Sequence, residues 1–136
     1  MGTGSGILAI AAARAFRAPV TAVDIDPESI RITRAHAQAN GVAPLLHLQA
    51  GNGFKAPLAQ QRAPYDLLLA NILARPLRQM AKAGAALVQP GGSIVLAGLL
   101  ATQVALVREA WQRQGCVLAH QDRRGEWTVL TLEKKG

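Results

Sequence analysis

The chain opens with the stretch MGTGSGILAI (residues 1–10), in which three glycines alternate with small polar residues before an apolar, alanine-rich segment. Glycine adopts backbone conformations with positive φ and lets a ligand approach the main chain closely. The apolar segment is expected to form a helix, whose first turn presents unpaired N–H groups and the positive end of the helix dipole. The stretch is therefore typical of a loop that holds a ligand with negative or electron-rich groups.

The glycine spacing narrows the choice of ligand. A dinucleotide-binding fingerprint needs a third glycine three positions after the second, and Ile7 stands there instead. The tighter spacing suits a ligand without a pyrophosphate, such as S-adenosylmethionine, whose amino and carboxylate groups can meet the loop backbone. The alternative is a glycine turn that only packs the helix against a strand. Ser5 lies in no G-x-S-x-G elbow, which disfavours a serine hydrolase.

Length and composition indicate one globular domain. The chain has 136 residues, half of them apolar, and its formal charge of +7 permits an anionic partner such as nucleic acid. The basic residues are scattered and aromatic residues are few, so the usual features of a nucleic-acid surface are missing. A single cysteine, Cys116, excludes an internal disulfide and fits a reducing compartment. We expect a single domain over residues 1–136, located in the cytoplasm.

Helical and strand patterns alternate along the chain. Helices are expected at about 5–16, 26–40, 75–88 and 102–114, strands at 20–24, 45–49, 65–70 and 93–97, a turn at 90–92, and a final hairpin at 116–132. This order predicts an α/β fold of the Rossmann-like kind, with a mostly parallel sheet covered by helices on both faces. In the first helix we expect Ile7, Leu8, Ile10 and Ala11 to face the sheet. Trp111 and Trp127 are expected in the core.

Polar residues follow three of the predicted strands, at the sheet edge where α/β proteins bind ligands. Asp24 can accept hydrogen bonds from both ribose hydroxyls, or it is a solvated acid at a strand end. Asn52 can bond an adenine edge, or it makes a turn with its glycine neighbours. Asn71 and the carbonyl of Ile72 can accept N–H bonds from an amine and direct its lone pair at a methyl group. The alternative for Asn71 is to cap the next helix; for Asp26, a helix cap is the preferred interpretation.

The start of the chain is unusual for this fold. The glycine loop should leave a central strand of about five residues, yet only Met1 precedes Gly2. The strands that carry Asp24 and Asn71 then lose the neighbour that should lie between them. We therefore expect the first strand to be missing and the chain to be the carboxyl-terminal part of a longer protein.

Together the motifs resemble those of class I S-adenosylmethionine-dependent methyltransferases. Within that class the chain is most similar to the catalytic domain of the bacterial methyltransferases of ribosomal protein L11. The resemblance spans almost the whole chain and is carried by GTGSGILAIAA (residues 2–12), VDIDP (23–27), ANILA (70–74), PGG (90–92) and GEW (125–127). The tetrad NILA, which replaces the NPPY of many amino methyltransferases, makes the resemblance much narrower than the glycine loop and acid alone.

The resemblance implies a cofactor, S-adenosylmethionine, and a substrate, the lysine side chains and amino terminus of a large-subunit ribosomal protein. It implies a seven-stranded sheet and a separate amino-terminal domain that grips the substrate and is absent from this chain. The sequence contains no cluster of Cys and His residues, so no metal site is expected. The expected cofactor-binding residues are Gly2, Gly4 and Gly6 for the methionine part, Asp24 for the ribose and Asn52 near the adenine, together with Thr3, Ser5, Ile25 and Asn71. The expected catalytic residues are Asn71 and Ile72.

Three alternatives stay open. The first is another amino methyltransferase of this fold, acting on a nucleobase or a glutamine side chain. The second is a non-catalytic module that binds the cofactor or RNA, which the positive charge permits and the scattered cations disfavour. The third is a nicotinamide dehydrogenase, which the glycine spacing disfavours.

Overall fold

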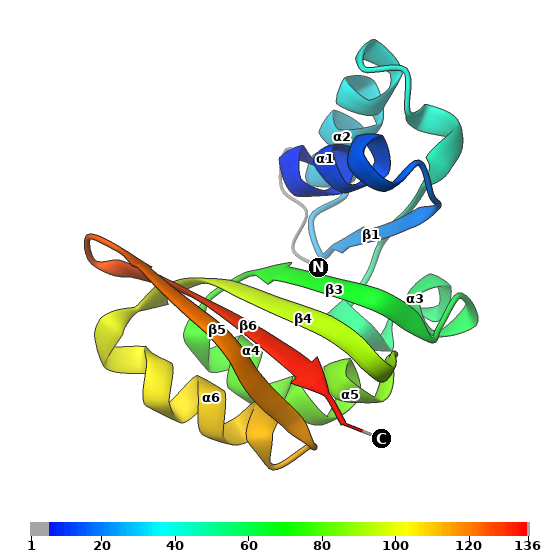
Figure 1. Ribbon diagram of the computed structural model, residues 1–136. Coiled ribbons are helices and arrows are strands. Elements are labelled where there is room, and N and C mark those ends of the chain that lie inside the picture. Colours follow the sequence, from blue (N-terminus) through cyan, green and yellow to red (C-terminus); the bar gives the residue numbers. More distant parts are fainter. Residues whose placement is uncertain (1–5, 136) are drawn as a thin grey trace. The chain divides into compact units, whose positions relative to one another are not determined.

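Two parallel strands, β1 (Val20–Asp24) and β2 (Leu46–Ala50), organise the first half of the chain (Figure 1). Their register runs from the pair Val20 and Leu46 to the pair Asp24 and Ala50, so both strands end at the same sheet edge. The computed structural model describes residues 6–135, which divide into two compact units, one ending at Arg62 and the other beginning at Ala63.

Three helices belong to the first unit: α1 (Ile7–Phe16), α2 (Pro27–Ala39) and α3 (Pro57–Gln61), with 3₁₀ turns η1 (Ala43–Leu45) and η2 (Gly53–Lys55). The apolar core joins α1, β1, α2 and β2 through small and branched side chains, namely Ala9, Ile10, Ala13, Ala22, Ala37, Val42 and Leu46. The helix α2 begins where the sequence predicts it, with Asp26 as N-cap and Pro27 in the first turn, and Gly41 follows its end with φ 70°.

The inward face of α1 differs from the predicted one. Ile10 is buried as expected, but Ile7 is 70% exposed, Leu8 is 46% exposed and Ala11 is also exposed. The buried partners of Ile10 are instead Ala9 and Ala13. Residues four apart share a helix face, so the stripe through positions 9 and 13 turns positions 7 and 11 to the opposite side. Small alanines allow the helix to approach the core closely.

The second unit is a four-stranded mixed sheet in the order β3-β4-β6-β5, formed by β3 (Tyr65–Asn71), β4 (Val88–Leu100), β5 (Cys116–Arg124) and β6 (Trp127–Lys134). The pair β3–β4 is parallel, whereas β4–β6 and β5–β6 are antiparallel. The C-terminal hairpin is thereby confirmed. Over the described residues the sheets are less parallel than predicted, because this hairpin adds two antiparallel pairings to the two parallel ones.

Helices α4 (Ala74–Gln79), α5 (Ala81–Ala86) and α6 (Val104–Gln112), the last preceded by the 3₁₀ turn η3 (Ala101–Gln103), lie along one face of the four-stranded sheet (Figure 1). The side chain of Trp111 on α6 is fully buried, as predicted, and its indole N–H donates to the carbonyl of Leu77 on α4 at 3.1 Å. Trp127 is 54% exposed and is not a core residue. Strand β6 alternates, with Thr128 and Leu130 facing inward, so Trp127 points outward.

Two further boundaries differ from the predicted ones. The single helix expected over 75–88 is divided into α4 and α5, because Met80, with φ −95° and ψ 2°, interrupts the helical backbone. The turn expected at 90–92 lies inside β4 as an irregularity. The pairing moves from Val88 opposite Tyr65 to Ser93 opposite Leu67, and Gly91 supplies the positive φ of 85° that this bend requires.

Within residues 6–135, β1 is hydrogen-bonded only to β2, and β3 only to β4. None of the helices in this part of the chain has the length and apolar character needed to cross a membrane.

Candidate functional site

Gly6 begins α1 in a conformation that favours glycine. Its φ is 85° and ψ is 8°, and its carbonyl accepts the N–H of Ile10 at 2.9 Å. A Cβ at this position would lie 2.6 Å from the γ-methyl carbon of Thr33, a fully buried residue of α2. The close packing of α1 on α2 thus needs glycine for two reasons, the positive φ and the missing side chain. The other predicted loop residues, Gly2, Thr3, Gly4 and Ser5, lie outside the described residues.

The carboxylate of Asp24 is held by a local turn at the end of β1. One of its oxygens accepts the backbone N–H of Asp26 at 2.9 Å. Asp26 in turn caps α2, accepting the N–H of Glu28 at 3.0 Å, which confirms the predicted helix cap. Ile25 between the two acids is 75% exposed. The edge therefore presents a carboxylate in a defined orientation beside an exposed apolar side chain.

The loop after β2 lies against the end of β1. The N–H of Gly51 donates to the carbonyl of Asp24 at 2.9 Å, so Asn52 and Asp24 belong to the same sheet edge, as predicted. Asn52 precedes η2 and is exposed, and its side chain makes no capping bond; the turn uses its backbone carbonyl, which accepts from Lys55 at 3.2 Å. Asn52 therefore takes part in a turn, the alternative interpretation of this residue, but only through its backbone. Its side-chain amide has no hydrogen bond to residues 6–135.

Asn71 ends β3 in the second unit, opposite Ala97 of β4, and its side chain is exposed. The following helix α4 begins at Ala74 with Leu73 as its N-cap, and no side chain caps it. Helix capping, the alternative considered for Asn71, is therefore not what the structure shows. In the described part of the chain the Asn71 amide has no hydrogen-bond partner, so its oxygen is available to a ligand.

Gly98 faces the Asn71 amide, and sequence reasoning missed it. Its φ is 80°, and a Cβ built on it would lie 2.6 Å from Oδ1 of Asn71 and 3.5 Å from the carbonyl oxygen of Ile72. Both predicted acceptors thus face the same side of one glycine. A signal was present, because Gly98 comes directly after the strand predicted over 93–97, at the edge that carries ligand-binding residues.

The remaining reactive groups do not suggest covalent or metal chemistry. Burial raises the pKa of the Cys116 thiol, only partly opposed by the nearby Lys134 charge, so the thiol stays protonated and weakly nucleophilic near neutral pH. Over residues 6–135, no three side chains of His, Cys, Asp or Glu are grouped closely enough to hold a metal ion. The arrangement is suited to binding and orienting ligands through oxygens and backbone.

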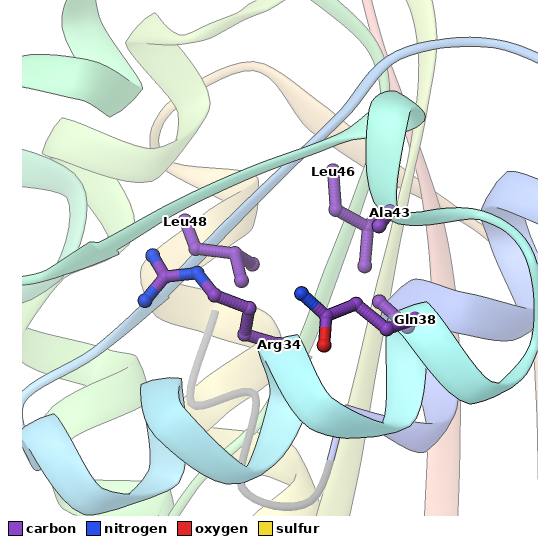
Figure 2. A pocket seen from close by; sticks show the side chains of 6 residues that line it. Arg34, Gln38, Ala43, Leu46 and Leu48 are labelled. Atoms are coloured by element: carbon purple, nitrogen blue, oxygen red, sulfur yellow. The ribbon is translucent and has the colours of Figure 1, made fainter.

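A pocket of about 250 Å³ in the first unit lies between α2 and β2 (Figure 2). Arg34 and Gln38 extend from α2 beside the apolar side chains of Leu46 and Leu48. None of the predicted site residues lines this pocket, and it has no part in the function proposed below.

Comparison with known proteins places these features in a family. Residues 1–135 match the family described as Ribosomal protein L11 methyltransferase (PrmA). A protein of Rhodopseudomonas palustris named ribosomal protein L11 methyltransferase is 43% identical over 134 residues, which is 98% of this chain. The chain spans 45% of that relative's length.

Solved structures share the fold. A ribosomal protein L11 methylase from Lactobacillus delbrueckii subsp. bulgaricus superimposes with a TM-score of 0.88 and 30% identity, covering 99% of this chain and 68% of that one. An RNA methyltransferase from Salinibacter ruber, solved in complex with S-adenosyl-L-homocysteine, has a TM-score of 0.75 and 20% identity, with 99% and 78% coverage. The match over nearly every residue, together with the Rossmann-like fold, shows that this chain belongs to the ribosomal protein L11 methyltransferase family.

Proposed function

We propose that this chain carries the catalytic domain of an S-adenosylmethionine-dependent enzyme that methylates amino groups of ribosomal protein L11. The observation that carries the proposal is the convergence of Asn71 Oδ1 and the Ile72 carbonyl oxygen on the bare face of Gly98, which offers two acceptors to one nitrogen. The names of the matching family and its relatives support ribosomal protein L11 as the substrate. The lysine side chains and amino terminus are the proposed acceptors because both carry primary amines. Such a substrate makes the cytoplasm the proposed location, and no stable nucleic-acid partner is proposed.

The residues of the first unit fit the cofactor. The Asp24 carboxylate, oriented by the N–H of Asp26, is an acceptor suited to a ribose diol, and the exposed Ile25 beside it offers an apolar surface. Asn52, on the same edge, has an unbonded amide for the adenine edge. Gly6, with residues 2–5 before it, is proposed to hold the methionine part at the start of α1. When bound, S-adenosylmethionine supplies a methyl group activated by a sulfonium charge.

The residues of the second unit orient the substrate nitrogen. A neutral primary amine has two N–H donors and one lone pair, and only the neutral form is nucleophilic. Asn71 Oδ1 and the Ile72 carbonyl accept the two N–H bonds, which fixes the direction of the lone pair. Partial desolvation of the amine lowers its pKa and favours the neutral form. The residues flanking Asn71 carry no acidic or basic side chain, so water is proposed to accept the proton.

Replacing Asp24 by alanine is expected to weaken S-adenosylmethionine binding by about 100-fold. Hydrogen bonds to a charged acceptor contribute about 1.5–3 kcal/mol, and the variant loses the acceptor of both ribose hydroxyls. Isothermal titration calorimetry measures the effect. Glu28→Ala is the matched control, because it removes an exposed acid at the start of α2 that is paired with Arg31. An unchanged dissociation constant in Asp24→Ala would exclude the ribose contact.

Transfer of a labelled methyl group from S-adenosylmethionine to purified ribosomal protein L11 tests the function. The proposal expects label on lysine or amino-terminal nitrogen, identified by mass spectrometry of the product. Label on glutamine side chains or on RNA bases would instead identify another amino methyltransferase of this fold. Tight, strongly salt-dependent RNA binding without S-adenosylmethionine binding would identify a non-catalytic module.

A further inference from the structure

We propose that Gly98 is a positioning residue: because it has no side chain, the Asn71 amide can lie where Oδ1 and the Ile72 carbonyl face one substrate nitrogen. The inference rests on the proposed function for its consequence in catalysis. Gly98 lies outside the glycine loop and is not one of the polar residues at strand ends, Asp24, Asn52 and Asn71, that carry the proposed chemistry.

A β-bulge places Gly98 beside Asn71. On the β3 side of β4, Ala97 is paired with Asn71. On the β6 side, the pairing moves from Leu96 opposite Leu130 to Leu99 opposite Thr128, so β4 has one more residue than its partner between these pairs. Such bulges bend a strand and redirect its residues, and they recur beside active sites. Here the bulge turns the bare side of Gly98 toward the end of β3.

The close approach leaves no room for a methyl group. A Cβ on Gly98 would lie 2.6 Å from Asn71 Oδ1, whereas ordinary contact begins at 3.4 Å, so the amide oxygen would have to move by about 0.8 Å. The Asn71 side chain is exposed and carries no hydrogen bond from residues 6–135 that would resist this movement. The displaced oxygen would no longer share one nitrogen with the Ile72 carbonyl.

Another glycine of the second unit, Gly115, separates this effect from backbone strain. Gly115 has φ 82°, close to the 80° of Gly98, and nothing lies within 4 Å of a Cβ built on it. Alanine at either position suffers the same unfavourable φ, but only Gly98→Ala also meets Asn71. Gly115→Ala, at the turn between α6 and β5, is therefore the matched control.

The first test compares the kinetics of the two variants in the purified protein that carries this chain. Gly98→Ala is expected to lower kcat by about 10- to 100-fold, the range that a displacement near 1 Å in a positioned group can produce. The affinity for S-adenosylmethionine is expected to stay within about two-fold of wild type, since the cofactor contacts are proposed in the first unit. Gly115→Ala is expected to keep both values. Equal kcat values in the two variants would overturn the inference.

The second test requires no activity and therefore separates the inference from the proposed function. Crystal structures of the two variants locate the Asn71 side chain directly. In Gly98→Ala, Oδ1 is expected to lie about 0.8 Å or more from its place in the wild type, and in Gly115→Ala it is expected not to move. An unmoved Oδ1 in Gly98→Ala would overturn the inference, whatever the activity. Failure of Gly98→Ala to fold while Gly115→Ala folds would also contradict it, because an exposed amide without hydrogen bonds can move at little cost.

Discussion

Replacing Asn71 by alanine is expected to slow methyl transfer by about 100- to 1000-fold while leaving the affinity for S-adenosylmethionine within about two-fold. The variant loses the side-chain acceptor that orients the amine and keeps the Ile72 carbonyl, so the loss falls on kcat. The fold should tolerate the change, because the Asn71 side chain is exposed, caps no helix and has no hydrogen-bond partner among the described residues. Single-turnover transfer and calorimetry measure the two quantities separately.

The variant Asn71→Asp tests whether the oxygen is the group that matters. A carboxylate keeps an acceptor at this place, but its negative charge favours the protonated, unreactive amine and raises the pKa of that amine. The rate is therefore expected to rise with pH over a higher range than in wild type, and to approach the wild-type rate once the amine is neutral. An Asn71→Asp variant as slow as Asn71→Ala at every pH, or equal losses of rate and cofactor affinity in Asn71→Ala, would contradict the proposed role.

Replacing Trp111 by alanine is expected to lower the free energy of unfolding of the second unit by about 3–5 kcal/mol. Its side chain on α6 is fully buried, and its indole N–H donates to the carbonyl of Leu77 on α4. The change leaves a large cavity and an unpaired buried carbonyl, in a protein whose total stability is expected at about 5–15 kcal/mol. Denaturant unfolding followed by circular dichroism measures the loss.

The chain supplies its own control for this prediction. Trp127 is 54% exposed on the outer side of β6, and Trp127→Ala is expected to change the free energy of unfolding by less than about 1 kcal/mol. Trp111→Phe keeps most of the apolar volume but loses the hydrogen bond, and an intermediate loss of about 1–3 kcal/mol is expected. Similar losses in Trp111→Ala and Trp127→Ala would show that the core is not built around Trp111.

Local signals in the sequence were reliable where a few neighbouring residues decide the structure. The start of α2 follows from Asp26 and Pro27 alone, because a cap and a fixed φ act within one helical turn. Predictions were wrong where packing selects among similar local patterns, as in the face of α1, where the alanine stripe and not Ile7 faces the core.

The features of the candidate site also divide into those that short sequence motifs determine and those that depend on packing. The sequence by itself determined the family and the strand ends that carry Asp24, Asn52 and Asn71, because these depend on short motifs and on strand boundaries. That all three share one rim stays a prediction.

Only the tertiary structure decided that Asn71 Oδ1 and the Ile72 carbonyl face Gly98. The physical reason is that β3 and β4 meet through a hydrogen-bond register between residues far apart in the sequence, and a bulge within β4 sets which side of Gly98 is turned toward Asn71. Residue periodicity predicts the strands but contains no information about their register or about the place of a bulge.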